Sequence, residues 1–104
     1  MHAQITARHF EADPALREHV HAQLTKLERC YNGITGAHIV LDHGKSPVSN
    51  KRAEITLSVY RQNLSAAHAA SSYEVAVNQC VNRLRKQVMR YKARLRSPDT
   101  DWQK

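Results

Sequence analysis

The sequence predicts an α+β domain in which a four-stranded mixed sheet carries two helices on one face, in the order β-α-β-β-β-α. Three observations support this fold class. Apolar residues recur at helical spacing in two segments, they alternate with polar residues in a segment between these two, and turn-forming residues separate the segments. The 104 residues suffice for one domain with one core. We place this domain at residues 1–96 and expect residues 97–104 to form a flexible tail.

The N-terminal third is expected to form a strand and a helix. Residues 4–10 alternate between apolar and polar side chains, which is typical of a strand. Asp13 and Pro14 then favour a helix start, because Asp caps free backbone N–H groups and Pro suits the first helical position. The helix is expected to end near Gly33. Its apolar stripe consists of Leu16, Val20, Leu24 and Leu27.

Three further strands are expected in the middle of the chain. Residues 37–43 are β-branched and apolar, residues 52–60 alternate most clearly, and residues 64–69 are a weaker candidate. Turns are expected at residues 44–50 and 61–63. The apolar side of the clearest strand consists of Ala53, Ile55, Leu57 and Val59, and its polar side of Arg52, Glu54, Thr56 and Ser58.

A long second helix is expected after Ser71 or Ser72, either of which can cap it, and should end before Ser97 and Pro98. Its tyrosines are expected to be core residues whose hydroxyls reach water. Its apolar stripe consists of Tyr73, Val77, Cys80, Val81, Leu84, Val88, Tyr91 and Leu95.

The connections predict the topology. A right-handed crossover through the first helix makes the first two strands parallel, and the short later connections make antiparallel pairs. Because only one face of the sheet is apolar, both helices should cover that face and leave the other open to water.

Positive charge is concentrated in residues 82–96, which hold seven basic residues and no acidic one. The rest of the chain holds nine of each sign, so this segment accounts for the net charge of +7. Such a localised basic patch is typical of a surface that binds a polyanion. At 100° per residue, four cations fall on one flank of the apolar stripe and three on the other. The first four are Arg83, Lys86, Arg90 and Arg94, and the other three are Arg85, Lys92 and Arg96.

A solvated face and a membrane anchor both fit this charged segment less well than a polyanion site. A merely solvated face would bring acidic partners at helical spacing, and residues 82–96 contain none. A membrane anchor would expose large apolar side chains, whereas this stripe is needed to cover the sheet. On the first helix, Arg17, Lys26 and Arg29 have acidic neighbours, and a solvated face is favoured there.

No catalytic or metal-binding pattern is present in the sequence. His19 and His21 point to different faces of a helix, and the remaining histidines lack zinc spacing. Cys30 and Cys80 are far apart and are expected to be buried free thiols. Neither a phosphate-binding glycine loop nor a nucleophile elbow occurs. We therefore expect no enzyme, cofactor, metal or small-molecule substrate. The absence of a signal peptide and of a membrane-spanning apolar run predicts a cytoplasmic protein.

Several short motifs occur in a definite order along the domain. "PALR" at residues 14–17 is followed by "KLER" at 26–29 and "HIVL" at 38–41, and Tyr73 later precedes the basic segment "NRLRKQVMRYKARL". In this order the motifs resemble those of the ribosome hibernation promoting factor family, which includes ribosome-associated inhibitor A. The resemblance covers residues 4–96 and is closest to the short form of that family.

The resemblance implies a bacterial protein that binds the small ribosomal subunit in the channel used by mRNA and tRNA. Such proteins block translation and hold ribosomes inactive in stationary phase and stress. Free in solution, we expect the chain to be a monomer. The implied 16S rRNA contacts are Arg83, Lys86, Arg90, Lys92 and Arg94, with Lys26 and Arg29 as second choices.

Two alternative functions remain open at this point. A helix, three strands and a helix are also the order of double-stranded RNA-binding domains, which recognise the shape of A-form RNA. The family is also associated with modulation of sigma-54 transcription, for which the polar face of the sheet would bind protein. Competition by plain duplex RNA would favour the first alternative, and polymerase association without RNA binding the second.

Overall fold

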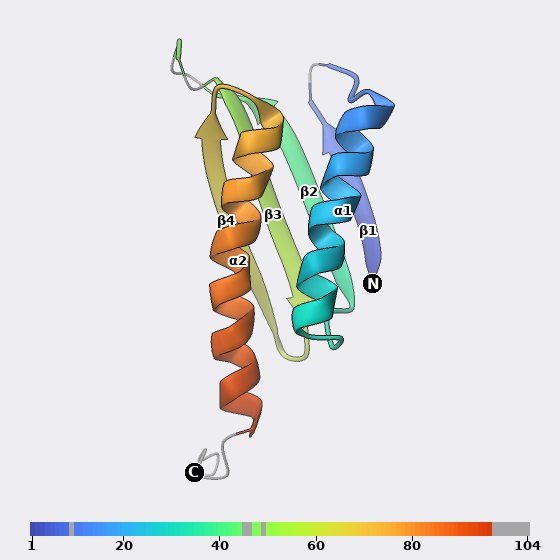
Figure 1. Cartoon of the computed structure of the whole chain (residues 1–104), viewed down its shortest axis with the longest axis vertical. Helices are drawn as coiled ribbons and strands as arrows, with labels where there is room; N and C mark the ends of the chain where they lie inside the picture. The colour runs from blue at the N-terminus through green and yellow to red at the C-terminus, as the bar shows by residue number, and fades with distance from the viewer. Residues whose placement is uncertain (9, 45–46, 49, 97–104) are drawn as a thin grey trace.

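The structure, a computed structural model, describes residues 1–8, 10–44, 47–48 and 50–96. Its element order is the predicted β-α-β-β-β-α (Figure 1). The strands lie in the order β1-β2-β3-β4, with β1 parallel to β2 and the other neighbouring pairs antiparallel. The elements are β1 (His2–Ala7), α1 (Pro14–Cys30), β2 (Gly36–His43), β3 (Lys51–Val59), β4 (Gln62–Ala70) and α2 (Tyr73–Arg96).

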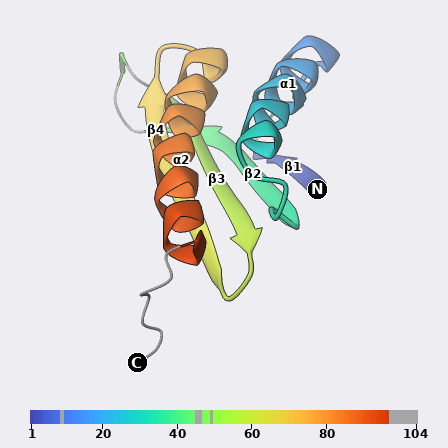
Figure 2. The same cartoon turned by 60° about the horizontal axis from the view of Figure 1, so that its bottom comes forward.

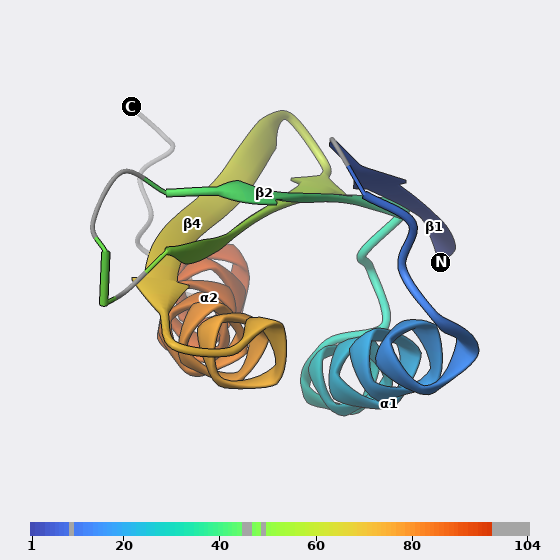
Figure 3. The ribbon, with the colours of Figure 1, turned by 90° about the horizontal axis from the view of Figure 1, so that it is seen from above.

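Both helices cover the same face of the sheet, as predicted, and the opposite face is left open (Figure 3). Figure 2 shows α2 over β3 and β4, and α1 on the side of β1 and β2. The core lies between the two layers. The apolar side of β3 and the stripes of both helices are buried in it, except that Tyr73 is half-buried and Leu95 is 50% exposed. The prediction for Leu95 is wrong because this residue lies one turn beyond Tyr91, the last core residue of α2.

Two boundary predictions need correction. The first strand runs from residue 2 to residue 7 instead of 4–10, because its parallel register joins His2 to Gly36 and Ala7 to Leu41. The chain must then leave the sheet to reach α1. The turn predicted at residues 61–63 consists of Tyr60 and Arg61, so β4 begins two residues earlier than expected.

Two predicted features are only partly described. Residues 45, 46 and 49 of the turn predicted at 44–50 lie outside the described residues. The Ser97 and Pro98 helix stop and the tail predicted at 97–104 lie outside them as well.

The starts of both helices follow the predicted caps. The Asp13 carboxylate accepts a hydrogen bond from the backbone N–H of Leu16 at 2.8 Å, which satisfies one free donor of α1. At the second helix the cap is Ser72, whose hydroxyl oxygen accepts from the N–H of Val75 at 3.2 Å. Each helix is therefore capped by a residue that the sequence predicted as its cap.

Helix α1 ends in the predicted region, residues 30–33, but without the predicted glycine signal. Its last residue is Cys30, the backbone of the following Tyr31 is extended (φ −161°), and Gly33 does not adopt a left-handed conformation. Gly33 also makes room for the Tyr31 ring, because a Cβ at position 33 would collide with that ring where the structure places it. Tyr31 also packs edge to face against Tyr91, with 5.8 Å between ring centroids.

The predictions for the tyrosine hydroxyls and the cysteines are partly wrong. The Tyr91 hydroxyl donates to the backbone carbonyl of Tyr60 at 2.6 Å, and the Tyr73 hydroxyl is buried, so neither reaches water as expected. Both cysteines are free thiols, but only Cys80 is buried, and Cys30 is half-buried. Burial raises the pKa of the Cys80 thiol to about 11.

Replacing Asp13 by Ala should lower the free energy of unfolding by about 1 kcal/mol, because the N–H of Leu16 loses its acceptor. Urea denaturation followed by circular dichroism measures this change. Asp13→Asn is the matched control, since the amide oxygen still accepts and should retain most of the stability. Equal stability of Asp13→Ala and the unmodified protein would contradict the capping role.

Candidate nucleic-acid interface

Helix α2 separates an apolar side from a cationic side. Val77, Leu84 and Val88 are fully buried against the sheet, which turns the basic residues between them outward. The amide of Gln87 donates to the backbone carbonyl of Ser65 in β4 at 2.9 Å, so one flank of α2 faces that edge strand. The cations on this flank are all exposed. They are Arg83, Lys86, Arg90 and Arg94.

Four exposed cations of α2 lack acidic partners among the described residues. Neither Arg83, Arg85, Lys86 nor Arg90 forms an ion pair with any residue that the structure describes. Elsewhere in the described chain, the N-terminal amine pairs with Glu28, Arg8 pairs with Asp42, and Arg52 pairs with Glu54. The charges of these four residues are therefore available to an external anion.

The second flank of α2 faces α1 across a groove of about 310 Å³. Lys26 and Arg29 from α1 and Arg85 from α2 line it. All three side chains are exposed, so the fold brings the second-choice residues of α1 beside α2. Sequence reasoning left Arg85 out of the site, although its helical position shared a flank with Lys92. The shared flank could therefore have been used to predict Arg85 as a site residue.

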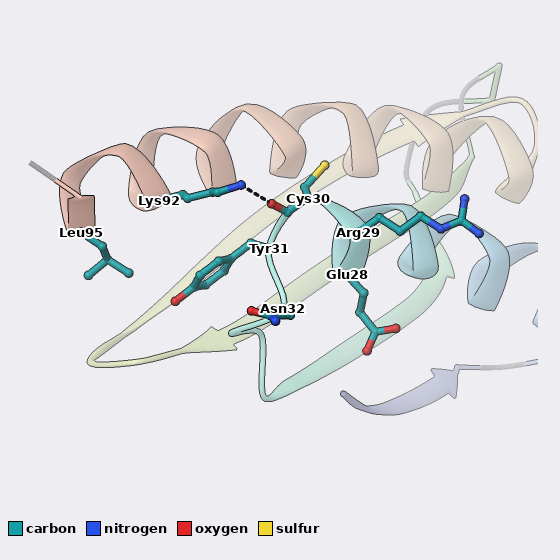
Figure 4. A pocket seen from close by; sticks show the side chains of 7 residues that line it. All are labelled: Glu28, Arg29, Cys30, Tyr31, Asn32, Lys92 and Leu95. Atoms are coloured by element: carbon teal, nitrogen blue, oxygen red, sulfur yellow. Dashed lines mark hydrogen bonds between the residues drawn. The ribbon is translucent and has the colours of Figure 1, made fainter.

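Lys92 has a structural role besides its charge. Its ammonium group donates to the backbone carbonyl of Cys30 at 2.9 Å (Figure 4), and its side chain is half-buried. Cys30 is the last residue of α1, where carbonyls lack partners within the helix and a cation is favoured. His19 and Asn78 form a second link between the helices, with 2.8 Å between Nε2 and Oδ1. These contacts hold α1 and α2 at a fixed spacing.

A second cavity of about 360 Å³ continues the groove towards the end of α2 and shares Arg29 and Cys30 with it. Tyr31 and Asn32 follow α1 in its wall, and Leu95 comes from the last turn of α2 (Figure 4). The groove thus leads from a cationic part to a part with an aromatic ring and an exposed leucine.

The open face of the sheet differs in charge from the helical face. Arg8 pairs with Asp42 across neighbouring strands at 3.4 Å, and Arg52 pairs with Glu54 at 3.7 Å. The charges on that face largely cancel, so positive potential is expected on the helical side alone.

The histidines that the structure describes do not gather on this surface. His19 contacts Asn78 and His21 is exposed, in agreement with their predicted placement on different faces. Within the described residues, no three His, Cys, Asp or Glu side chains lie close enough to hold a metal ion. No helix in the described part of the chain is long and apolar enough to cross a membrane.

Residues 3–96 match the family described as sigma 54 modulation protein / S30EA ribosomal protein. The chain belongs to this family. It is the family that includes the hibernation promoting factors, so the resemblance of the sequence is confirmed. Members are ribosome-associated factors, which agrees with a cationic surface suited to RNA.

Two solved structures are similar to this S30EA family member. A ribosomal subunit interface protein from Coxiella burnetii has a TM-score of 0.79 and 24% identity, covering 89% of this chain and 99% of its own. The N-terminal domain of Protein Y from Thermus thermophilus has a TM-score of 0.75 and 26% identity. This match covers 88% of the present chain and 99% of the Protein Y domain. The first likeness concerns the fold alone.

Replacing Lys92 by Met should lower the free energy of unfolding by about 1 kcal/mol, since the carbonyl of Cys30 loses a charged donor. The matched control is Lys86→Met, which removes the same charge from an exposed position and should stay within about 0.5 kcal/mol of the parent protein. Urea denaturation of the three proteins checks this. Equal effects of both substitutions would show that Lys92 is only a surface charge.

Proposed function

We propose that this protein is a ribosome-binding translation inhibitor that occupies the mRNA and tRNA channel of the small subunit. The observation that carries the proposal is a group of exposed α2 cations that have no acidic partner among the described residues. They are Arg83, Arg85, Lys86 and Arg90. Family membership supports the ribosome as the target. The RNA of a bacterial ribosome would provide the negative charges that pair with these cations. The proposal implies a cytoplasmic location and activity in stationary phase or stress.

The mechanism is occlusion without a chemical step. Arginine binds phosphate through two parallel hydrogen bonds, and lysine acts as a point charge. We assign the main 16S rRNA contacts to one flank of α2, at Arg83, Lys86, Arg90 and Arg94. Lys26 and Arg29 of α1 contact the RNA across the groove, and we add Arg85 to them. Lys92 contributes its charge while its ammonium group holds α1. The ribosome-binding unit is residues 1–96.

The helical face must lie against rRNA for this mechanism, with the open sheet face directed away. In that orientation the body of the domain fills space that mRNA and tRNA need. The paired charges on the sheet face would neither attract nor repel rRNA strongly. No cofactor, metal or small-molecule substrate takes part.

The two alternative functions would use different binding partners and surfaces. A general double-stranded RNA module would bind plain duplexes through phosphates and 2′-hydroxyls. The family description also names sigma 54 modulation, which would use the sheet face for protein contacts. Excess duplex RNA in the binding assays below separates the first alternative from the proposed function.

Binding to isolated small subunits should weaken steeply with salt. Four to six phosphate contacts correspond to a slope of roughly −3 to −5 in a plot of log affinity against log salt, at roughly 0.7–0.9 per neutralised phosphate. Co-sedimentation of the purified protein with small and large subunits over a salt series measures the slope. Selective binding to small subunits that resists excess duplex RNA is expected. A flat salt dependence would refute the electrostatic mechanism.

Neutralising Arg83, Lys86 and Arg90 together with Gln should weaken small-subunit binding by tenfold or more, and reduce the magnitude of the salt slope by about 2–3. The matched control replaces Arg8, Arg52 and Arg61 with Gln, which removes the same charge away from α2. Thermal denaturation verifies that both variants are folded. Equal loss of affinity in the two variants would mean that net charge, and not the α2 surface, determines binding.

A further inference from the structure

We infer that the cavity at the end of the interhelical groove is a binding site for one unpaired RNA base. The inference rests on the proposed function, because it specifies which form of RNA the same surface receives. The cavity measures about 360 Å³, which is within the range of pockets that hold small ligands. Its lining residues are Glu28, Arg29, Cys30, Tyr31, Asn32, Lys92 and Leu95.

The cavity combines an aromatic ring with an exposed aliphatic side chain. Tyr31 is half-buried at the end of α1, and Leu95 is 50% exposed on the last turn of α2. Figure 4 shows both side chains at the end of the cavity formed by the last turns of α2, together with Lys92. A planar base can stack on an aromatic ring irrespective of its identity, because every base has a π-face.

The ring of Tyr31 is held in place before any ligand binds. It packs edge to face against Tyr91, whose own hydroxyl is fixed on the Tyr60 carbonyl at 2.6 Å. Gly33 leaves room for the ring, since a Cβ there would collide with it. A pre-ordered ring loses little conformational entropy when a base stacks on it.

The cations of the groove lead to this ring. Arg29 lines both cavities, Lys26 and Arg85 lie further along the groove, and Lys92 projects at the aromatic end. A cationic track with an aromatic platform is the arrangement that binds single-stranded nucleic acid. In a duplex the bases are stacked and paired, so no base could enter the cavity while phosphates follow the cations. The geometry therefore favours an unpaired rRNA segment.

One polar group in the wall can contact the edge of a base. Asn32 is exposed and its side-chain amide makes no hydrogen bond with a described residue, so its donor and acceptor are free. The Glu28 carboxylate is engaged by the N-terminal amine at 3.0 Å. Asn32 is thus the group that would read the base, while the ring and Leu95 would hold it.

The base site can be tested without ribosomes. The full chain, labelled for NMR, is titrated with AMP, UMP and ribose 5-phosphate. The two nucleotides should shift the Tyr31 ring, the Leu95 methyls and the Asn32 side-chain amide, whereas ribose 5-phosphate should shift only groups near the cations. The same shifts with all three ligands, or nucleotide shifts confined to other regions, would overturn the inference.

A second test measures affinity for small subunits. Tyr31→Leu should weaken binding about fivefold or more, in line with the contribution of a stacked base, while Tyr31→Phe should bind like the parent. Tyr60→Leu is the matched control, because Tyr60 is 65% exposed on the β3–β4 turn and does not line the cavity. Leu95→Ser and Asn32→Ala change exposed residues, so they report on the cavity even if Tyr31→Leu fails to fold.

The outcomes separate the inference from the proposed function. Selective, salt-dependent binding by the parent with unchanged affinity in the Leu95 and Asn32 variants would reject the base site and leave the ribosomal function intact. Failure of the parent to bind small subunits would reject the proposed function, and the nucleotide titration would then decide the base site by itself.

Discussion

The repulsion among like charges on α2 is the constraint to which the rest of the structure is adapted. Each pair of cations three or four residues apart costs an isolated helix roughly 0.2–0.5 kcal/mol. Burial of a Val or Leu side chain contributes about 1.5–3 kcal/mol, and the opposite side of α2 buries Val77, Leu84 and Val88 completely. The helix therefore remains stable although Arg83, Arg85, Lys86 and Arg90 have no acidic partner among the described residues, and the positive potential is preserved for a ligand.

The fixed spacing of the two helices gives this potential a shape. Lys92 bonds the end of α1, and His19 bonds Asn78, so the groove between the helices does not depend on a bound partner. Arg85 and Arg29 reach this groove from different helices, which joins two weakly charged flanks into one surface. The sheet keeps its charges paired on the other side. The domain therefore has one cationic side and one nearly neutral side.

Local patterns in the sequence were sufficient to predict most of the fold. The alternation in β3, the Asp13 cap and the apolar stripe of α2 each depend on neighbours in the sequence, and the structure contains all three. The motifs shared with the hibernation promoting factor family predicted the ribosome as the binding partner. A turn was predicted near Tyr60 and Arg61, but its exact position could not be, because Arg61 adopts a positive φ of 68° without the glycine or asparagine that normally marks such a position.

The features missed from the sequence depend on contacts between distant residues. Gly33 was expected as a helix terminator, but it makes room for a ring that packs against α2, some sixty residues away. Lys92 was expected as an RNA contact alone, and its bond to Cys30 exists only once the helices are packed. The cavity between Tyr31 and Leu95 has the same origin, because neither residue carries a local signal for it.

The central claim is that the basic face of the helices occupies the tRNA and mRNA channel of the small subunit. Its most direct test is displacement of labelled tRNA from small subunits programmed with mRNA, as the protein is added at constant salt. We expect tRNA and the protein to exclude one another, with full displacement at saturating protein and a tenfold or higher concentration needed for half-displacement by the variant that lacks Arg83, Lys86 and Arg90. Simultaneous binding of tRNA and the protein to one small subunit would contradict it.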